Sequence, residues 1–331
     1  MPQYHVYGVG NALVDMEFEV SEDTLAKLEV DKGLMTLIEE DRHHELLANL
    51  NLGDARQCSG GSAANTVIAT AQLGANSFYS CKVADDDTGN FYMKDLNEAG
   101  VSSNLTLTNR ESGVTGKCIV LITPDAERSM NTYLGITQRI SLRELDEAAI
   151  KASEFVYIEG YLAPENDARA AAIKTREIAE AAGVKTALTL SDVNMVKFFK
   201  DGMNDMLGGG VDLLFCNLEE ALLMTGATDI HSAAPELQKI SKQFAVTLGS
   251  QGALLFDGEN TLEIPAESVT PIDSNGAGDI YAGTFLYGLT HGMSFGDCGK
   301  MAGAAATELV QHFGARLPTE SLQVIKQKFN S

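Results

Sequence analysis

Residues 154–192 have the sequence EFVYIEGYLAPENDARAAAIKTREIAEAAGVKTALTLSD. The two ends of this stretch, EFVYIEG and KTALTLSD, are short apolar runs of the kind that form strands buried on both faces. Between them, PENDARAAAIKTREIAEAAG has an acidic start, strong helix formers and a closing glycine, Gly183, which are typical of a helix with a glycine C-cap. The stretch therefore predicts two parallel strands joined by a crossover helix.

The same alternation of strands and helices continues on both sides of this segment. Further apolar runs are YHVYGV, SFYSCKVA, VDLLFCN and FAVTLG, and helical patterns separate them. Strands that are apolar on both faces and separated by helices indicate a parallel sheet covered on both sides. The sequence predicts an α/β fold with a mostly parallel central sheet between two helical layers.

Two segments depart from this alternation and predict a small β unit. From Asp15 to Val20, polar and apolar residues alternate strictly, as in a half-exposed strand. Residues 117–123 are followed by the turn Pro124-Asp125 and a returning segment through Tyr133, which is typical of a hairpin. We expect a single domain over residues 1–331. Its main body would span about 1–11, 41–110 and 135–331, and its β lid about 12–40 and 111–134.

Composition and charge exclude several classes of protein. The chain has 24 Lys and Arg against 46 Asp and Glu, a formal charge of −22, so its surface repels nucleic acids and anionic membranes. Its five cysteines are an odd number without any CxxC pair, which indicates reduced thiols. The N-terminus has no signal-peptide pattern, and no uncharged apolar run approaches the length of a membrane span. We therefore expect a cytoplasmic protein without nucleic-acid or membrane partners.

Polar residues follow the predicted strands at the ends where ligands bind in open α/β sheets. Such sheets bind ligands beyond the carboxyl ends of their strands. The residues at these ends are Asn11 and Asp15, Ser191 and Asp192, Asn217, and Thr247 with Gly249. The sequence predicts a cleft lined by them.

The segment DSNGAGD, Asp273–Asp279, runs directly into the helical pattern IYAGTFLYGLTHG. Gly276, Ala277 and Gly278 are small enough to let a phosphate approach the backbone, where unpaired amides and the helix dipole favour an anion. Asp279, in the first turn, could accept a proton from an attacking hydroxyl. The alternative interpretation is a glycine-containing turn capped by Asp279.

DSNGAGD resembles the DTxGAGD signature of the PfkB (ribokinase-like) family, and the resemblance covers essentially the whole chain. Further segments that resemble family motifs are GVGNALVD (8–15), CSGGSAANTVIATAQLGA (58–75), NLEE (217–220) and TLGSQG (247–252). The resemblance implies a ribokinase-like three-layer fold with a β lid and an ATP-dependent small-molecule kinase. In this interpretation Asp279 is the catalytic base, and the amides from Gly276 to Asp279 hold the transferred phosphoryl group.

On the substrate side, the resemblance implies that five residues contact the acceptor. A carboxylate such as Asp15 can accept two hydrogen bonds from a vicinal diol, and the alternative is an acidic residue on the exposed face of a lid strand. Glycines before a helix allow close approach to a sugar. These residues are Asn11, Asp15, Gly60, Gly61 and Asn65.

On the nucleotide side, the resemblance implies that ATP lies against Asp192, Asn217, Thr247, Gly249, Gly252 and Gly314. Asn217 and Glu220 would hold Mg²⁺ through water, unless they are only a helix N-cap with a supporting acid. TLGSQG could instead be an ordinary left-handed turn between two strands. The segment QHFGAR (311–316) lies where family members close the adenine pocket and sometimes hold a monovalent cation such as K⁺.

The segments SGGSAANT, ERSMNTYLG and EGYL resemble the adenosine-kinase-like branch of the family. Asn131 would supply hydrogen bonds into the cleft, and Arg128 and Glu159 are candidates for selectivity, although Arg128 could instead pair with a lid carboxylate. The polar side chains facing the substrate favour an uncharged polyol. Adenosine or another nucleoside is the first choice, and ribose or another free sugar is the second.

Two rival functions and the oligomeric state remain open. A nicotinamide-dependent oxidoreductase would need a small residue where GVGNAL has Leu13, and a non-catalytic sensor would usually lack the catalytic Asp or the glycines of the anion site. The protein is expected to be a monomer or a homodimer. The pair His43-His44 lies in a polar helical stretch and is expected on a solvated face.

Overall fold

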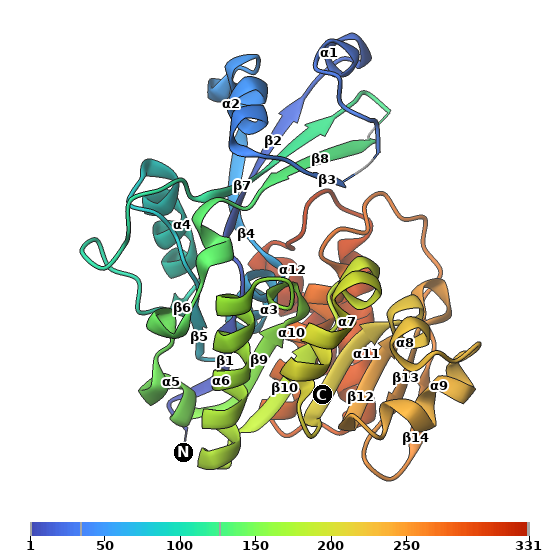
Figure 1. The fold of residues 1–331 in the computed structure, drawn as a ribbon. Helices are drawn as coiled ribbons and strands as arrows, with labels where there is room; N and C mark the ends of the chain where they lie inside the picture. Colours follow the sequence, from blue (N-terminus) through green and yellow to red (C-terminus); the bar gives the residue numbers. More distant parts are fainter. Residues whose placement is uncertain (1, 34, 126, 330–331) are drawn as a thin grey trace.

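The computed structural model describes residues 2–33, 35–125 and 127–329, and Figure 1 shows that they form two sheets. The larger sheet has nine strands in the order β14-β13-β12-β11-β10-β9-β1-β5-β6. Neighbours from β12 to β6 pair in parallel, and β13 and β14 extend the sheet as antiparallel strands. The predicted α/β fold with a mostly parallel sheet is confirmed. Its strands are β1 (Tyr4–Val9), β5 (Ser77–Ser80), β6 (Val101–Ser102), β9 (Ser153–Glu159), β10 (Lys185–Thr189), β11 (Val211–Asn217), β12 (Ser241–Thr247), β13 (Ala253–Phe256) and β14 (Thr261–Ile264).

The predicted crossover helix between two parallel strands is present. Strands β9 and β10 pair in parallel, with Val156 opposite Thr186, and α6 (Asn166–Ala182) joins them. The helix ends at Gly183, whose φ of +71° is in the left-handed region that favours glycine. The apolar runs therefore form adjacent strands because the helix between them packs back on the sheet.

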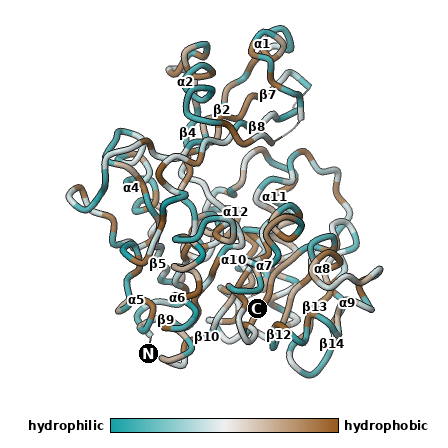
Figure 2. The backbone as a smooth tube through the Cα atoms, viewed as in Figure 1, coloured by the Kyte–Doolittle hydropathy of each residue, from teal (hydrophilic) through white to brown (hydrophobic). Residues whose placement is uncertain are grey.

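Alternate side chains of the buried strands point to opposite faces, and each face has its own helices. In β9, Phe155 and Tyr157 pack toward one face, and Val156 and Ile158 pack toward the other. Figure 2 shows the apolar strands among more polar helices and loops. The first face carries α3 (Ser62–Gln72), α4 (Asp87–Glu98), α10 (Ala277–Thr290), α11 (Phe295–Leu309) and α12 (Thr319–Phe329). The second carries α5 (Glu147–Lys151), α6, α7 (Val193–Leu207), α8 (Leu218–Thr225) and α9 (Ile230–Leu237).

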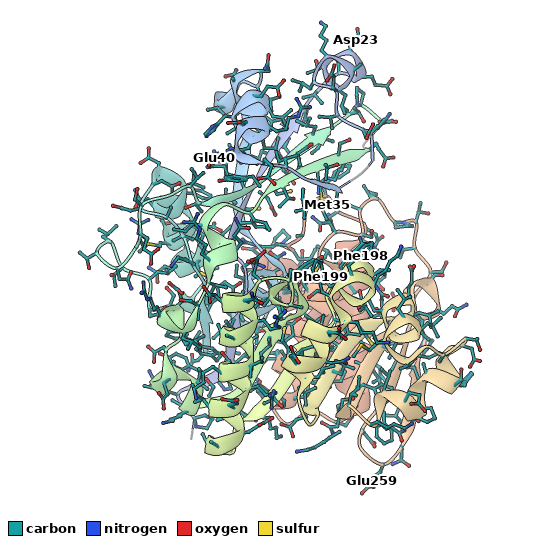
Figure 3. The ribbon with its side chains drawn as sticks, in the orientation of Figure 1. Asp23, Met35, Glu40, Phe198, Phe199 and Glu259 are labelled. Carbon is teal, nitrogen blue, oxygen red and sulfur yellow. The ribbon has the colours of Figure 1, made fainter. Side chains whose placement is uncertain are left out.

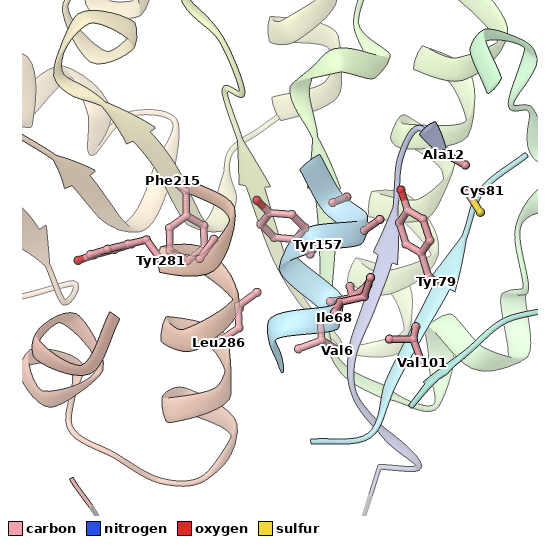
Figure 4. Close-up of a cluster of buried hydrophobic side chains, with 14 of the residues drawn as sticks. Val6, Ala12, Ile68, Tyr79, Cys81, Val101, Tyr157, Phe215, Tyr281 and Leu286 are labelled. Carbon is pink, nitrogen blue, oxygen red and sulfur yellow. The ribbon is translucent and has the colours of Figure 1, made fainter. Parts of the chain in front are cut away.

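Helices α3 and α10 are fixed beside each other by the first of these cores. Figure 4 shows Ile68 of α3 and Leu286 of α10 among buried side chains of the sheet. Burial of each large apolar side chain contributes about 1.5–3 kcal/mol to stability. Gly283 allows the two helices to approach closely, because a Cβ atom there would lie 2.9 Å from the Cβ of Ala69. This packing matters for function because both helices begin at the candidate site.

Among the described residues, no helix combines the length and the apolar character that a bilayer crossing requires.

The smaller sheet stands above the body in Figure 1 and has the strand order β3-β8-β7-β2-β4. Residues 56–60, which were predicted to lie in the main body, form its edge strand β4 because they pair with β2. Helices α1 (Glu22–Lys27) and α2 (Glu40–Ala48) lie beside it. Its strands are β2 (Leu13–Glu19), β3 (Met35–Leu37), β4 (Arg56–Gly60), β7 (Gly116–Ile122) and β8 (Arg128–Tyr133).

The two faces of the smaller sheet differ in character. Met16, Phe18 and Ile119 point to the outer face and pack with Leu28 and Leu46 around α1 and α2. The opposite side, which we call the Asp15 face, carries a row of paired residues along one register line. This row consists of Cys58, Asp15, Cys118, Thr132 and Leu37.

His43 is buried on the outer face, contrary to the expectation of a solvated helix face. Its side chain is 1% exposed, and its ring lies 5.1 Å from that of Tyr133. Neither ring nitrogen has a hydrogen-bond partner in the part of the chain that the structure describes. Burial and then the nearby charge of Lys117 lower the pKa of His43 to about 4. The polar composition of α2 concealed this orientation, which only the packing on β8 establishes.

We expect His43→Leu to increase the free energy of unfolding by about 1 kcal/mol at neutral pH, because leucine removes unpaired buried nitrogens. The difference should widen as the pH falls from about 6.5 to about 4, since only the wild-type unfolded state gains a proton at this position in that range. Urea denaturation across this pH range measures it. His44→Leu, at an exposed neighbour, is the matched control. A stability loss in His43→Leu at every pH would show that the imidazole has a polar partner.

Candidate active site

Polar residues lie side by side along the carboxyl edge of the larger sheet. The register pairs Val9 with Ile158 just before Asn11, and Glu159 with Thr189 just before Asp192. Further along the sheet, Asn217 pairs with Thr247. The structure thus brings Asn11, Asp192, Asn217 and Thr247 to one edge, which is where ligands bind in open α/β sheets, whereas Asp15 lies in the smaller sheet.

The segment DSNGAGD forms the approach to α10 and leaves backbone N–H groups unused. The first hydrogen bond of the helix runs from the N–H of Ile280 to the carbonyl of Gly276, at 2.9 Å. The amides of Gly278 and Asp279 therefore lie outside the helical ladder. A Cβ atom at Gly278 would have no neighbour within 4 Å among the described residues. This open space before a helix N-terminus suits an anion.

Gly276 and Gly278 differ in their need for glycine. Gly276 has φ +75°, and a Cβ atom there would lie 2.5 Å from the carbonyl oxygen of Ala315. Gly276→Ala is therefore expected to lower the free energy of unfolding by about 1–2 kcal/mol or more. Gly278→Ala is the matched control and should keep or slightly raise stability, because alanine is the better helix former. Chemical denaturation of both variants tests this, and equal losses would contradict the assigned strain at Gly276.

Asp279 is held by two donors from the start of α3. The hydroxyl of Ser62 donates to Oδ1 at 2.6 Å, and Nδ2 of Asn65 donates to Oδ2 at 3.0 Å. Burial raises the pKa of Asp279 to about 6, and these two hydrogen bonds oppose the rise. A carboxylate with such a pKa is ionised at neutral pH and can still accept a proton.

The glycine pair before α3 brings the helix start against the first strand. Gly61 has φ +106°, and a Cβ atom there would collide with the carbonyl oxygen of Asn11. A Cβ atom at Gly60 would lie 2.6 Å from Oδ2 of Asp15. The absence of side chains at both positions therefore lets α3 begin beside Asp15.

Asp15 faces the body from β2, and its carboxylate receives no hydrogen bond from the described residues. Burial raises its pKa to about 7, with the charge of Arg316 opposing this and that of Glu17 adding to it. A half-buried carboxylate without donors is suited to receive hydroxyl groups of a ligand.

Glu159 and Asn11 connect the strands beneath the site. Glu159 is fully buried, and its two oxygens accept the N–H groups of Asn11 at 2.6 Å and Ala63 at 2.8 Å. The side-chain oxygen of Asn11 accepts from Thr137 at 3.4 Å. Burial raises the pKa of Glu159 to about 7. Glu159 therefore fixes the backbone on both sides of the site, and its carboxylate is already used by that backbone.

Arg128 connects the smaller sheet to the segment before α10. It forms ion pairs with Glu17 of β2 and, at 2.6 Å, with Asp273. Asp273 also accepts the N–H of Gly314 at 2.9 Å. The pairing of Arg128 with a lid carboxylate, left open by the sequence, is therefore present, and it extends to the body.

Asn131 lies on the face of the smaller sheet opposite Asp15. The register places it beside Ile119, whereas Asp15 lies beside Cys118. Its side chain is buried, and its Nδ2 has no partner among the described residues. Because side chains alternate along a strand, the structure does not bring Asn131 to the proposed acceptor position.

Asn217 and Glu220 form a capping box at the start of α8. The Asn217 side chain accepts the N–H of Glu220 at 2.9 Å, and Glu220 accepts both N–H and Nδ2 of Asn217. Burial raises the pKa of Glu220 to about 7. The described residues contain no cluster of three or more His, Cys, Asp or Glu that could hold a metal directly. The oxygen donors here fit Mg²⁺ bound through water, as few protein ligands suffice for that ion.

The remaining residues of the proposed nucleotide side have mixed roles. Asp192 caps α7 by accepting the N–H of Asn194 at 2.7 Å. Gly249 has φ +58°, and the space around its missing side chain is open, whereas Gly252 is packed against the segment after β14. Thr247 ends β12 beside Asn217. Gly314 lies instead near Asp273, beneath the smaller sheet.

Sequence reasoning missed two side chains at the site. Ser62 lies inside the quoted motif SGGSAANT, so its position next to the glycines could have indicated a role. Arg316 contacts Asn65 and Asp95, and nothing local in QHFGAR predicts those partners. The role of Arg316 becomes visible only when α3 and the segment before α12 come together.

Comparisons with known proteins agree with this geometry. The model of the family described as "pfkB family carbohydrate kinase" matches residues 30–322. The solved structures of a probable sugar kinase from Rhizobium etli and an adenosine kinase from Sinorhizobium meliloti are each 32% identical with a TM-score of 0.88. They cover 99% and 98% of this chain, and 99% of each of those chains is matched. The adenosine kinase of Saccharomyces cerevisiae is 27% identical over 342 residues, covering 96% of this chain and 98% of that protein.

The fold and the site define a kinase, a phosphotransferase with an alcohol group as acceptor. The chain belongs to the pfkB family of carbohydrate kinases, and its fold is ribokinase-like. The resemblance noted in the sequence is thereby confirmed. The oxidoreductase and sensor alternatives are not supported by these matches.

Proposed function

We propose that this kinase transfers the γ-phosphate of ATP to the primary hydroxyl of a ribose-containing nucleoside, with adenosine as the first choice. The observation that carries the proposal is the position of Asp279. Its carboxylate lies in the first turn of α10, next to the free amides of that helix end. A base and an anion site adjacent to each other are what in-line phosphoryl transfer requires.

The chemical step needs few protein groups. As the acceptor hydroxyl attacks, its proton passes to Asp279, an oxygen–phosphorus bond forms, and the bond from the γ-phosphorus to the β–γ bridging oxygen breaks to release ADP. The free amides of Gly278 and Asp279 stabilise charge on the transferred group, together with that of Gly276, whereas the N–H of Ala277 already donates to the carbonyl of Ser274 at 3.2 Å. Mg²⁺, held through water by Asn217 and Glu220, would offset the triphosphate charge.

Asp15 is proposed to bind the two secondary hydroxyls of the ribose. It faces the body from β2 and has no hydrogen-bond donor in the described residues, and Gly60 lies next to it. A carboxylate that accepts two hydrogen bonds from a diol orients the sugar and leaves the primary hydroxyl directed away. In the proposed pose, the primary hydroxyl points toward Asp279.

Exposed apolar side chains on the Asp15 face favour an acceptor with a base over a free sugar. Leu37 is 60% exposed and lies on the register line of Asp15, and Met35, 46% exposed, lies on the next line of that face. Figure 3 shows Met35 on the side of the smaller sheet toward the body, with Phe198 and Phe199 of α7 below it. A planar base would cover apolar surface here, whereas ribose alone would leave it in water.

The names of the matched relatives, and the pairing of the arginines around the site, support a neutral nucleoside as the acceptor. Matched relatives include adenosine kinases, and they also include a ribokinase and a sugar kinase. A phosphorylated acceptor would need free basic groups. Arg128 and Arg316, which contact residues around the site, are both paired with carboxylates.

The smaller sheet is proposed to act as a lid that excludes water during transfer. Its strands carry Asp15 and Arg128, so its closure would complete the acceptor site and prevent ATP hydrolysis. We extend the lid of about residues 12–40 and 111–134 by the strand 56–60, which pairs with β2. A cytoplasmic location belongs to the same proposal, supported by five cysteines that are all unpaired.

A coupled assay of ADP release tests the substrate. The acceptors are adenosine, inosine, ribose, fructose and their monophosphates, each with ATP and Mg²⁺. We expect kcat/KM for adenosine or inosine to exceed that for ribose by at least about 100-fold, as expected when a base buries apolar surface equivalent to about 3 kcal/mol. Preference for ribose would replace the nucleoside proposal with a ribokinase. Absence of ADP release with every acceptor would reject this set of substrates.

A further inference from the structure

Arg316 links four parts of the molecule next to the proposed base. It follows α11 and precedes α12, and its side chain is only 16% exposed. Its Nη1 donates to Asp95 of α4 at 3.1 Å, and its Nη2 donates to Ser59 of β4 at 2.7 Å. Its Nε donates to Oδ1 of Asn65 at 3.3 Å. Asp95 also accepts from the N–H and hydroxyl of Ser59, so the guanidinium is held from two sides.

The contact with Asn65 determines which way its amide points. A guanidinium has only donors, so the amide atom next to Arg316 must be the oxygen. The amide nitrogen then lies on the other side, where it donates to Oδ2 of Asp279 at 3.0 Å. With the amide turned over, its oxygen would face the Asp279 carboxylate and its nitrogen would face a cation.

We infer that Arg316 is a positioning residue that fixes the Asn65 amide so that its NH₂ group points at Asp279. The inference rests on the proposed function, because it concerns the base of that reaction. Arg316 acts through Asn65 and does not touch Asp279 itself. Asp95 and Ser59 hold Arg316 in the orientation that this requires.

Asn65 matters because Asp279 has few donors around its carboxylate. Ser62 supplies one hydrogen bond and Asn65 the other. Charge interactions also link Asp279 to acidic side chains and phenols on neighbouring elements, and the Arg316 guanidinium lies on the far side of the Asn65 amide. The acidic side chains and phenols are Asp15 on β2, Tyr79 on β5, Tyr157 and Glu159 on β9, and Tyr161 just after β9. Loss of the Asn65 donor would therefore favour the protonated form of the base.

Arg316 has a second effect that can be separated from the first. Its charge is the strongest influence opposing the burial of Asp15, which keeps that carboxylate nearer to ionised. This effect needs only a positive charge at the position. Orientation of the Asn65 amide needs the fixed geometry of the guanidinium, which an ammonium group lacks. Arg316→Lys and Arg316→Met therefore distinguish the two roles.

The test compares pH profiles of kcat and KM for wild type, Arg316→Lys, Arg316→Met, Asn65→Leu and the double variant Arg316→Met with Asn65→Leu. In both Arg316 variants, we expect the pH below which kcat falls (the acid limb of the profile) to rise by about half to one unit. This is the size expected when a carboxylate loses a hydrogen-bond donor. Arg316→Met should also raise KM several-fold, and Arg316→Lys should not. Asn65→Leu should move the limb at least as far as Arg316→Met. In the Asn65→Leu background, Arg316→Met should add no further limb shift.

The control is Arg143→Met, at an exposed arginine paired with Glu111 away from the site. An unchanged acid limb in Arg316→Met, or an equal further shift in the Asn65→Leu background, would overturn the inference. A higher KM with the wild-type pH profile would overturn it too, since general loosening of the site predicts that result.

A readout without substrate separates this inference from the proposed function. The carboxyl stretch of Asp279 is assigned by infrared difference spectra against Asp279→Asn and followed from pH 4 to 9 in the free protein. Its titration midpoint should rise in Arg316→Met by the same amount as the kinetic limb. If the midpoint rises but no acceptor is phosphorylated, the positioning stands and the kinase proposal fails. An unmoved midpoint rejects the positioning whatever the activity.

Discussion

Asp279→Asn is expected to lower kcat for phosphotransfer by about 10²- to 10⁴-fold while leaving the fold intact. Asparagine has the same shape, but it cannot take up the proton of the attacking hydroxyl. Its amide oxygen can accept from Nδ2 of Asn65, and its NH₂ group can donate to the hydroxyl oxygen of Ser62. The free energy of unfolding should therefore change little, and kcat from single-turnover and steady-state assays should carry the loss.

The matched control for this variant is Asp297→Asn. Asp297 is also an acid in the first turn of a helix, α11, and it also accepts from a serine, Ser294 at 2.7 Å. It is paired with Lys300 on the surface. We expect wild-type kcat for Asp297→Asn. Wild-type kcat for Asp279→Asn would show that another group accepts the proton.

Asp15→Ala should lower kcat/KM by roughly 10²- to 10⁴-fold, mainly through KM, because two charge-assisted hydrogen bonds to the ribose diol are lost at about 1.5–3 kcal/mol each. The deoxy acceptors 2′-deoxyadenosine and 3′-deoxyadenosine should lose less in the variant than in the wild type. Glu19→Gln, on the same strand and face but paired with Arg56 at the surface, is the control and should keep wild-type kinetics.

The same carboxylate predicts a pH dependence for the free enzyme. Burial raises the pKa of Asp15 to about 7, and only the ionised form accepts two hydrogen bonds. In the wild type, kcat/KM should therefore decrease as the pH falls below about 7. For Asp15→Ala, kcat/KM should decrease only below about pH 6, where Asp279 becomes protonated. An Asp15→Ala enzyme with unchanged KM for adenosine would mean that the diol binds elsewhere.

Much of the fold could be predicted from local patterns. Apolar runs such as VDLLFCN became strands with the predicted bounds, because a strand buried on both faces must be apolar throughout. Gly183 ends α6 as the sequence predicted, because the left-handed conformation there favours glycine. At the site, the amides before α10 and the acid in its first turn also follow from a short motif.

The strand pairing of the smaller sheet could not be predicted from local sequence patterns. Its strands pair across long sequence separations, so residues 56–60 could not be assigned to it from their own composition. A shift of one position along a strand reverses the face of a side chain. Asn131 illustrates this. Its hairpin was predicted from the sequence, but the side of the sheet to which Asn131 points depends on its pairing with Ile119. His43 likewise became buried because α2 packs on β8.

By itself, the sequence determined the parallel sheet, its crossover helices and the helix start that carries Asp279, since each depends on hydrophobic period, glycine conformation or helix ends within a few residues. Only the tertiary structure decided the partners of Asp279, the face of Asn131 and the position of Arg316 beside Asn65. Asn65 and Arg316 are separated by 251 positions in the chain. Contacts over such separations depend on how α3, α4 and the segment before α12 pack together, and no local pattern encodes that packing.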